Sequence, residues 1–92
     1  MQNRNWIQRI TDGMELESEL LPLMPVIEIA GEKRVLIEHH GGISEYSGVR
    51  IGVKVRFGTV WIIGKDLEVI RMSAEQLIIS GRIDCVQLQG RN

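Results

Sequence analysis

The segment that most constrains the fold is residues 49–57, which read VRIGVKVRF. Every second position in it is apolar, namely Val49, Ile51, Val53, Val55 and Phe57. The positions between them carry arginine, glycine or lysine. Successive side chains of a β-strand point to opposite faces of the sheet, so this alternation predicts a strand with one buried face and one face in solvent. The chain is therefore expected to be built around a β-sheet.

Shorter segments with similar alternation follow residue 25, and short turns that mostly contain glycine separate them. The further segments expected to be strands are 26–30, 34–40, 60–64, 67–72, 77–81 and 82–88. Turns, which glycine and short polar residues favour, are expected at 31–33, 58–59 and 64–66. About seven short strands joined in this way predict an all-β domain over residues 26–90, folded as a small antiparallel meander or sandwich.

Composition agrees with this class of fold. The chain has 92 residues, of which 43% are hydrophobic and 4% aromatic, and ten are glycine. Branched aliphatic residues with frequent glycine favour strands and tight turns over helices. A chain of this length forms one domain and buries roughly 60–65% of the surface that its unfolded form exposes. Such a domain supports one modest core and leaves little room for a deep substrate cleft.

A partial internal repeat leaves a second architecture open. The segment VWIIG at 60–64 resembles LIISG at 77–81, and a short polar turn and another strand are expected after each. Two successive hairpins of similar length would explain the likeness. A short β-solenoid, whose successive rungs stack and share a core, would explain it as well. Two copies of the segment do not decide between these folds.

Residues 1–25 differ in character from the rest of the chain. Trp6, Ile7 and Ile10 lie at roughly helical spacing, and Pro22 and Pro25 would stop any helix. A short N-terminal helical arm is therefore expected ahead of the β domain. The arm lacks the continuous apolar core of a signal peptide, and no apolar run approaches the roughly 20 residues that span a bilayer. The single cysteine excludes an intrachain disulfide and favours a reducing, cytosolic location.

Both histidines lie in the segment VLIEHHGGISEY. Zinc sites need three or four converging ligands, whereas His39 and His40 are adjacent and would point to opposite faces of a regular strand. Glu38 and His40 share a face, but the sequence offers no third ligand beside them. We therefore expect no metal site. The simpler interpretation is a structural turn in which the side chains at the strand end bond to the glycines that follow, with Glu38, His40, Gly41 and Gly42 as its members.

No other segment has the pattern of an active site. Ser44 and Glu45 are close to the histidines, but the sequence around them is not a nucleophile elbow of the Gly-x-Ser-x-Gly type. No glycine-rich segment has the spacing of a phosphate-binding loop. We therefore expect a protein that is not an enzyme and that uses no cofactor and no small-molecule substrate.

Two sets of residues are candidates for binding a partner. Arg50, Lys54 and Arg56 share the polar face of one expected strand and would suit a phosphate or an anionic surface. They leave a small β-barrel nucleic-acid-binding module as an alternative function. The formal net charge of -1 argues against that alternative, because dedicated nucleic-acid binders usually carry a basic excess. A solvated sheet face with cross-strand acidic partners is the simpler interpretation.

The second set is apolar. Trp61 and Ile63 lie opposite Val60 and Ile62, so this strand is apolar on both faces, and Ile78 repeats the effect at 77–79. Strands of this kind are either covered on both sides or bind a partner. The N-terminal arm would supply one cover, and self-association into a homo-oligomer would supply another. We expect partner binding at Trp61, Ile63 and Ile78.

Two longer segments resemble a known family. The first segment is PVIEIAGEKRVLIEHHGGISEY, and the second is GTVWIIGKDLEVIRMSAEQLIISGRIDCVQL. They are similar to the two halves of the YabP/YqfC family of sporulation proteins, and most similar to its YqfC branch. The resemblance covers about residues 25 to 88. The chain departs from the family pattern at His39, where the family often has asparagine, and at Gly41, where it often has arginine.

The resemblance implies a role in endospore formation, in the cytoplasm of the mother cell of a differentiating bacterium. It implies a small structural or assembly component and no catalytic residues. Because the YqfC branch is often encoded beside a membrane sporulation protein, the resemblance also implies a membrane-associated partner and a location peripheral to the membrane. Self-association and binding of such a partner are the two forms of assembly expected here.

Overall fold

The computed structural model describes residues 24–91, and they form an all-β domain. Its strands are β1 (Val26–Ala30), β2 (Arg34–Glu38), β3 (Ile43–Tyr46), β4 (Arg50–Val55), β5 (Gly58–Met72) and β6 (Gln76–Gly90). They form one six-stranded sheet in the order β1-β2-β6-β5-β4-β3. Every pair of neighbours is antiparallel, which confirms the predicted fold class. The solenoid alternative is wrong, because stacked rungs would require parallel neighbours.

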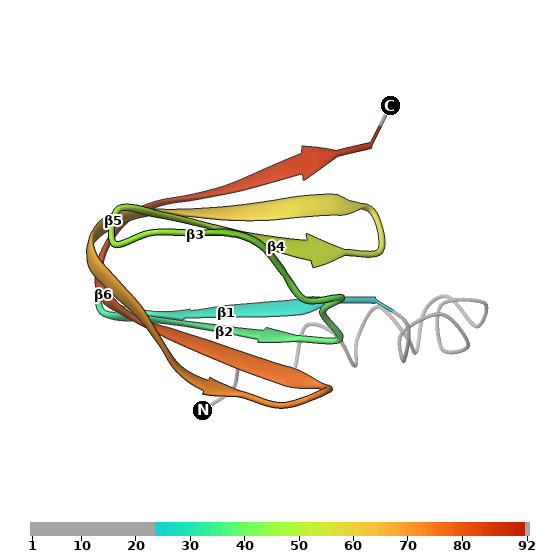
Figure 1. Ribbon diagram of the computed structural model, residues 1–92, viewed down its shortest axis with the longest axis horizontal. Helices are drawn as coiled ribbons and strands as arrows, with labels where there is room; N and C mark the ends of the chain where they lie inside the picture. Colours follow the sequence, from blue (N-terminus) through green and yellow to red (C-terminus); the bar gives the residue numbers. More distant parts are fainter. Residues whose placement is uncertain (1–23, 92) are drawn as a thin grey trace, which may run out of the picture.

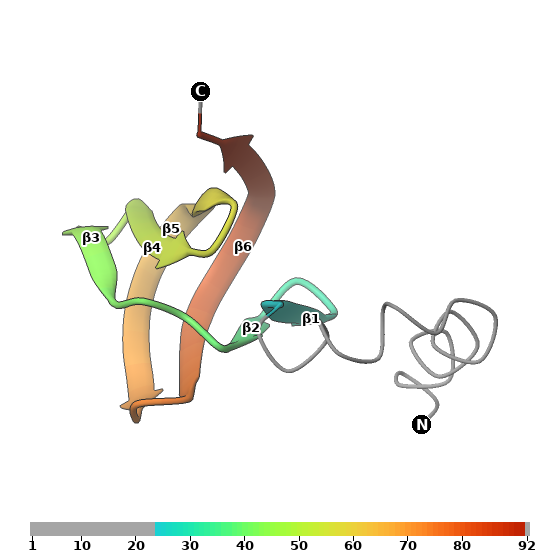
Figure 2. The same cartoon turned by 90° about the vertical axis from the view of Figure 1, so that its right-hand side faces the viewer.

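The sheet folds over on itself because β5 and β6, each of 15 residues, bend in the middle while remaining side by side (Figures 1 and 2). One layer contains β1, β2, the first half of β6 and the second half of β5, and is called the β1 layer below. The other contains β3, β4, the first half of β5 and the second half of β6, and is called the β4 layer. The sheet does not close into a barrel, since β1 and β3 remain its two ends.

The expected division into about seven short strands is wrong at four places. The chain continues as strand through residues 64–66 and 81–82, where turns or breaks were expected, so four expected strands form only β5 and β6. Residues 43–46 form β3, which the alternation did not reveal. β2 ends at Glu38, two residues earlier than expected, because His39 takes a φ of 63°.

The bends explain the internal repeat of the sequence. Gly64 and Gly81 end the two similar segments, and each lies where its long strand bends. A Cβ atom on Gly64 would lie 1.8 Å from the carbonyl oxygen of Arg82, and one on Gly81 would lie 2.5 Å from that of Asp66. The two backbones thus approach too closely for any side chain. The repeat marks one shared corner of the sheet and not two rungs or two separate hairpins.

The β1–β2 turn and the β3–β4 turn are each hydrogen-bonded to this corner, in equivalent ways. The N–H of Gly64 donates to the carbonyl of Val49 in the β3–β4 turn, at 3.0 Å. The N–H of Gly81 donates to the carbonyl of Lys33 in the β1–β2 turn, at 3.2 Å. Outward from β5 the sheet continues with β4 and then β3, and outward from β6 it continues with β2 and then β1. The two halves of the sheet therefore have the same arrangement. The domain therefore has approximate two-fold internal symmetry, which relates β1 to β3, β2 to β4 and β6 to β5.

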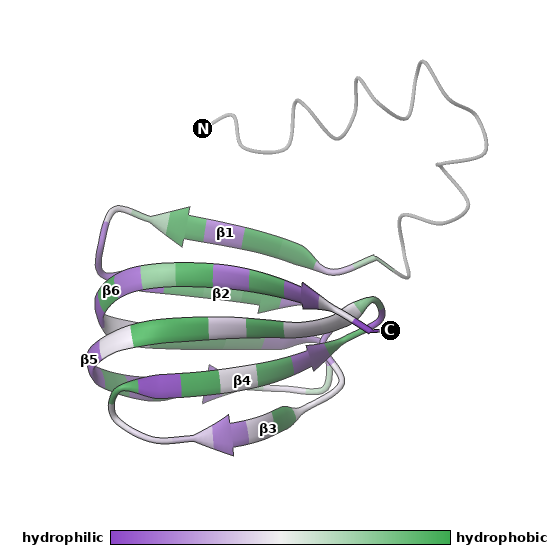
Figure 3. Ribbon diagram, turned by 90° about the horizontal axis from the view of Figure 1, so that it is seen from above, coloured by the Kyte–Doolittle hydropathy of each residue, from purple (hydrophilic) through white to green (hydrophobic). Residues whose placement is uncertain are grey.

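The core lies between the two layers. The side chains with no exposed surface are Val35, Ile37, Leu77 and Ile79 from the β1 layer, and Ile51, Val53, Val60 and Ile62 from the β4 layer. Burying one such side chain contributes about 1.5–3 kcal/mol. The alternation that singled out residues 49–57 thus correctly identified the inward positions of β4. Figure 3 shows the resulting bands of apolar and polar residues along the strands.

The predicted helical arm falls on residues 1–25, and residues 1–23 lie outside the described part of the chain. Within residues 24–91, no helix is long and apolar enough to cross a membrane.

Candidate functional site

His40 connects two turns. Its Nδ1 atom accepts a hydrogen bond from the N–H of Gly42 at 3.0 Å, and its Nε2 atom lies 2.9 Å from the carbonyl oxygen of Ser73. A carbonyl oxygen can only accept, so the neutral tautomer with a proton on Nε2 satisfies both contacts. His40 therefore ties the β2–β3 connection to the turn between β5 and β6.

The residues around His40 hold the same connection in place. The N–H of Gly41 donates to the carbonyl of Lys54 at 2.7 Å, and the N–H of Lys54 donates to the carbonyl of Gly42 at 2.8 Å. Gly42 has a φ of 108°. Glu38 is half-buried at the end of β2, where it faces Gln76 across the strand pair. Because these bonds join segments of the two layers, the geometry of this segment is that of a structural link.

His39 is exposed to solvent, and the conformation of its backbone explains why a histidine can occupy this position. Its N–H donates to the carbonyl of Glu75 at 2.8 Å, and its φ of 63° lies in the left-handed region. Asparagine and histidine are among the few non-glycine residues that adopt this region readily. Among residues 24–91, no group of three or more histidine, cysteine, aspartate or glutamate side chains is arranged to hold a metal ion.

On the outer face of the β4 layer, Trp61 and Arg50 are in contact. The guanidinium carbon of Arg50 lies 4.0 Å from the centroid of the Trp61 ring, which is a cation–π contact. Trp61 also donates from Nε1 to Oε1 of Gln89 at 2.6 Å. Its ring occupies the space above Gly52, where a Cβ atom would lie 2.6 Å from Cζ3 of the tryptophan. Trp61 is thus held against its own sheet, and a nucleic-acid base would have to displace Arg50 to stack on that ring face.

The three basic residues are not equivalent. Arg50 is engaged with Trp61, and its Nε lies 3.9 Å from a carboxylate oxygen of Glu45. Lys54 is exposed on the same outer face. Arg56 is exposed just beyond the end of β4, and its carbonyl accepts a hydrogen bond from the side chain of Arg91. The charge available to an anionic partner on this face is therefore smaller than the sequence suggests.

The predicted apolar surface is divided between opposite sides of the molecule. Ile63 is half-buried and pairs with Arg50 and Cys85, so it shares the outer face of the β4 layer with Trp61. Ile78 is half-buried and pairs with Leu36, so it lies on the outer face of the β1 layer. The bends of β5 and β6 separate the three residues, which do not form one continuous surface.

Sequence reasoning missed a different apolar surface, the opening along one side of the sandwich. Ile29 pairs with the buried Val35 and Leu88 pairs with the buried Val60, so both point inward, yet they are 54% and 59% exposed. Figures 1 and 3 show β1 and the second half of β6 at the same side of the molecule, one in each layer, with β1 extending beyond β6. We call this side of the sandwich, which is bounded by β1 and the second half of β6, the open side. Ile29 lies on it near the corner of the sheet, and Leu88 lies near the other end of β6. Alternation marks both residues as inward but cannot show where the opposite layer ends.

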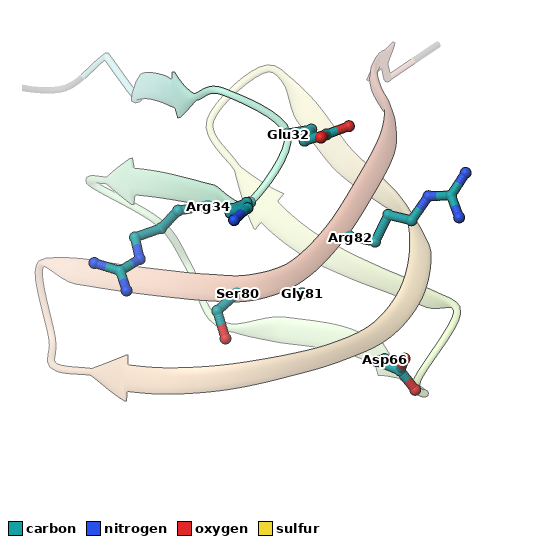
Figure 4. Close-up of a pocket in the computed structure, with 7 residues that line it drawn as sticks. Glu32, Arg34, Asp66, Ser80, Gly81 and Arg82 are labelled. Atoms are coloured by element: carbon teal, nitrogen blue, oxygen red, sulfur yellow. The ribbon is translucent and has the colours of Figure 1, made fainter.

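The corner of the sheet has a shallow depression of about 700 Å³, lined by residues 32–34, Asp66 and residues 80–82. In Figure 4 the side chains of Glu32, Arg34 and Arg82 point away from one another. Arg82 lies with its Nε 3.3 Å from a carboxylate oxygen of Asp84. Since the charged groups diverge, the depression has no converging set of ligand contacts.

The comparisons with known proteins agree with the resemblance seen in the sequence. The profile of the YabP family matches residues 24–92. The chain is also 24% identical over 78 residues to the uncharacterised protein YqfC of Bacillus subtilis, a match that covers 85% of this chain and 84% of that protein. No solved structure gives a significant match. Because the profile covers the whole described β domain, the chain belongs to the YabP family.

Proposed function

We propose that the chain is a non-catalytic component of endospore formation that acts by assembly, through contacts with another copy of itself or with a membrane-associated sporulation protein. The observation that carries the proposal is the open side, where the inward-pointing Ile29 and Leu88 are more than half exposed. Family membership supports the process, because the sequence pattern of this family implies sporulation.

A sandwich that is open on one side exposes apolar side chains to water, and a partner that covers them would stabilise the complex. Covering a large aliphatic side chain contributes about 1.5–3 kcal/mol relative to leaving it exposed. Exposed strand edges beside such side chains are templates for pairing with another chain. The formal net charge of -1 opposes self-association little, since strong mutual repulsion needs a larger charge. These features favour a protein that functions when a partner covers the open side.

The experiment measures assembly and its dependence on the open side. The mass of the full chain is determined by light scattering at increasing concentration, for the wild type and for Ile29→Glu. Val49→Glu is the matched control, because Val49 is 59% exposed and lies in the β3–β4 turn. The same proteins are used to capture a membrane sporulation protein from sporulating cells, with the captured protein identified by mass spectrometry.

We expect Ile29→Glu to lower the assembled fraction or the specific capture, and Val49→Glu to leave both unchanged. A wild-type chain that stays monomeric at high concentration and captures no membrane protein would refute the proposal. Equal losses in both variants would show that the open side is not the surface involved.

A further inference from the structure

We infer that the edge of β6 along the open side pairs, antiparallel, with the same edge of a second copy of this chain. This inference rests on the proposed function and names one interface for it. The hydrogen-bonding pattern shows which groups would pair. The N–H of Arg91 donates to the carbonyl of Phe57 at 2.9 Å, and hydrogen-bonded pairs alternate with non-hydrogen-bonded pairs along an antiparallel ladder. Hence the N–H and C=O groups of Val86, Leu88 and Gly90 point away from β5, to a side where no strand of residues 24–91 pairs.

The other edges of the sheet carry features that discourage pairing. β1 begins directly after Pro25 and has Glu28 at its centre, and β3 is a four-residue strand with a shift of register. The second half of β5 contains a register shift between Val69 and Arg71. Proteins protect their exposed edges by such means: proline, charge, short strands and bulges.

The part of β6 after Asp84 has none of these protections. Residues 85–90 read CVQLQG, without charge or proline, and their register against β5 is unbroken. A long, uncharged and regular edge is the one most open to a partner strand. Among the strands described, β6 is therefore the edge on which pairing is least opposed.

A second copy fits this edge better than another kind of strand because the edge is complementary to itself. In an antiparallel pair centred on Leu88, the outward groups of Val86 bond to those of Gly90 in the other copy, and the two Leu88 residues face each other. Asp84 and Arg91 flank the segment with opposite charges. Antiparallel pairing places the acidic end of one copy beside the basic end of the other. The contact is the same for both copies and closes as a two-fold dimer.

The same pairing covers the open side. A strand added beside β6 extends the β4 layer beyond its present edge, on the side where β1 extends beyond β6 (Figure 3). It would therefore extend over the inward face of β1 and bring the two Leu88 side chains together, which reduces their exposure. The N-terminal arm is the other candidate occupant of this edge, and the concentration dependence of amide protection described below separates it from a second copy.

Sedimentation velocity on the full chain tests the interface, with Leu88→Lys as the main variant and Val49→Lys as its control. Val49 is as exposed as Leu88, at 59%, and lies in the β3–β4 turn, so it adds the same charge outside the proposed interface. Two lysines at position 88 would face each other at the two-fold axis, where like charges opposite one another are destabilising. We expect a wild-type dimer, at least a tenfold rise in its dissociation constant for Leu88→Lys, and no change for Val49→Lys. Thermal unfolding of dilute samples checks that both variants fold.

Thiol crosslinking locates the contact without relying on a loss of binding. The native cysteine is exposed, so it is first replaced as Cys85→Ser. A short bismaleimide is then expected to give covalent dimers when Leu88→Cys is added, and not when Ser44→Cys is added on the exposed edge strand β3.

The outcomes separate this inference from the proposed function. A dimer that survives Leu88→Lys and is lost in Trp61→Glu overturns edge pairing and leaves assembly standing. A chain that is monomeric throughout but captures a membrane sporulation protein also overturns edge pairing and leaves the proposed assembly role standing. Protection of the Val86 and Leu88 amides from hydrogen exchange should rise with protein concentration. Protection that is independent of concentration would assign the edge to the chain's own N-terminal segment and overturn the inference.

Discussion

The approach of β5 and β6 at their bends leads to a stability prediction for a single added methyl group. In Gly64→Ala the new Cβ would lie 1.8 Å from the carbonyl oxygen of Arg82 and 3.0 Å from its carbonyl carbon. Non-bonded heavy atoms settle near 3.5 Å, so the two backbones must separate by roughly 1.7 Å. Neither atom belongs to a flexible side chain that could move aside.

The cost of this separation has two parts. Forced overpacking costs about 1–3 kcal/mol, and the bond from the N–H of Gly64 to the carbonyl of Val49 would be lost or weakened, at about 1 kcal/mol. We therefore expect Gly64→Ala to lower the free energy of unfolding by about 3 kcal/mol. For a domain of this size, that lowers the thermal midpoint by roughly 12–24 °C.

Urea unfolding followed by circular dichroism measures the effect, with Gly48→Ala as the control. A Cβ on Gly48 would meet no atom within 4 Å, so this variant should stay within about 0.5 kcal/mol of the wild type. If Gly64→Ala were as stable as Gly48→Ala, the two strands could not approach as closely as described, and the account of the corner would be wrong.

Three further predictions concern the link between the layers and the outer face. Gly42→Ala should lower the free energy of unfolding by about 1–2 kcal/mol, because Gly42 has a φ of 108°. Gly41→Ala should be nearly neutral, since its Cβ would make only ordinary contacts at 3.6 Å. Equal stabilities of the two variants in urea would contradict this prediction. His40→Ala should cost about 1–3 kcal/mol, because it leaves two backbone groups without their partner, and a variant as stable as the wild type would remove the anchoring role. Gly52→Ala should displace the ring of Trp61 and shift its fluorescence, at a smaller cost than Gly64→Ala because a side chain can move; an unchanged spectrum relative to the wild type would count against the packing of this ring.

Much of the fold follows from alternation alone. The β1–β2 hairpin was predicted from VIEIA, a glycine turn and RVLIE, and the inward positions of β4 from VRIGVKV. The bends were not predictable in the same way. Glycine in a strand pattern marks a turn, a bulge or a close approach of another backbone. Gly64 marks a close approach of another backbone, and this is known only once β6 is seen to lie beside β5.

The surfaces were harder to predict than the strands. Arg50 and Trp61 were assigned to separate candidate sets, one basic and one apolar, and the register that pairs Gly52 with Trp61 brings them together. Ile78 was grouped with Trp61 on apolar character, and the fold of the sheet puts them on opposite sides. Alternation gives the face of a strand to which a residue points, but the layer to which that face belongs depends on contacts between distant segments.

The two bent strands also determine how the domain can come apart. β5 and β6 each supply one half to each layer, and they are hydrogen-bonded to each other along both halves. Because the two layers share these strands and one core, we expect unfolding to occur in one cooperative step, without a partly folded species that retains a single layer. Because β2 pairs with residues 76–80, which lie far along the chain, the β1 layer is complete only when the β1–β2 hairpin has come to lie beside β6.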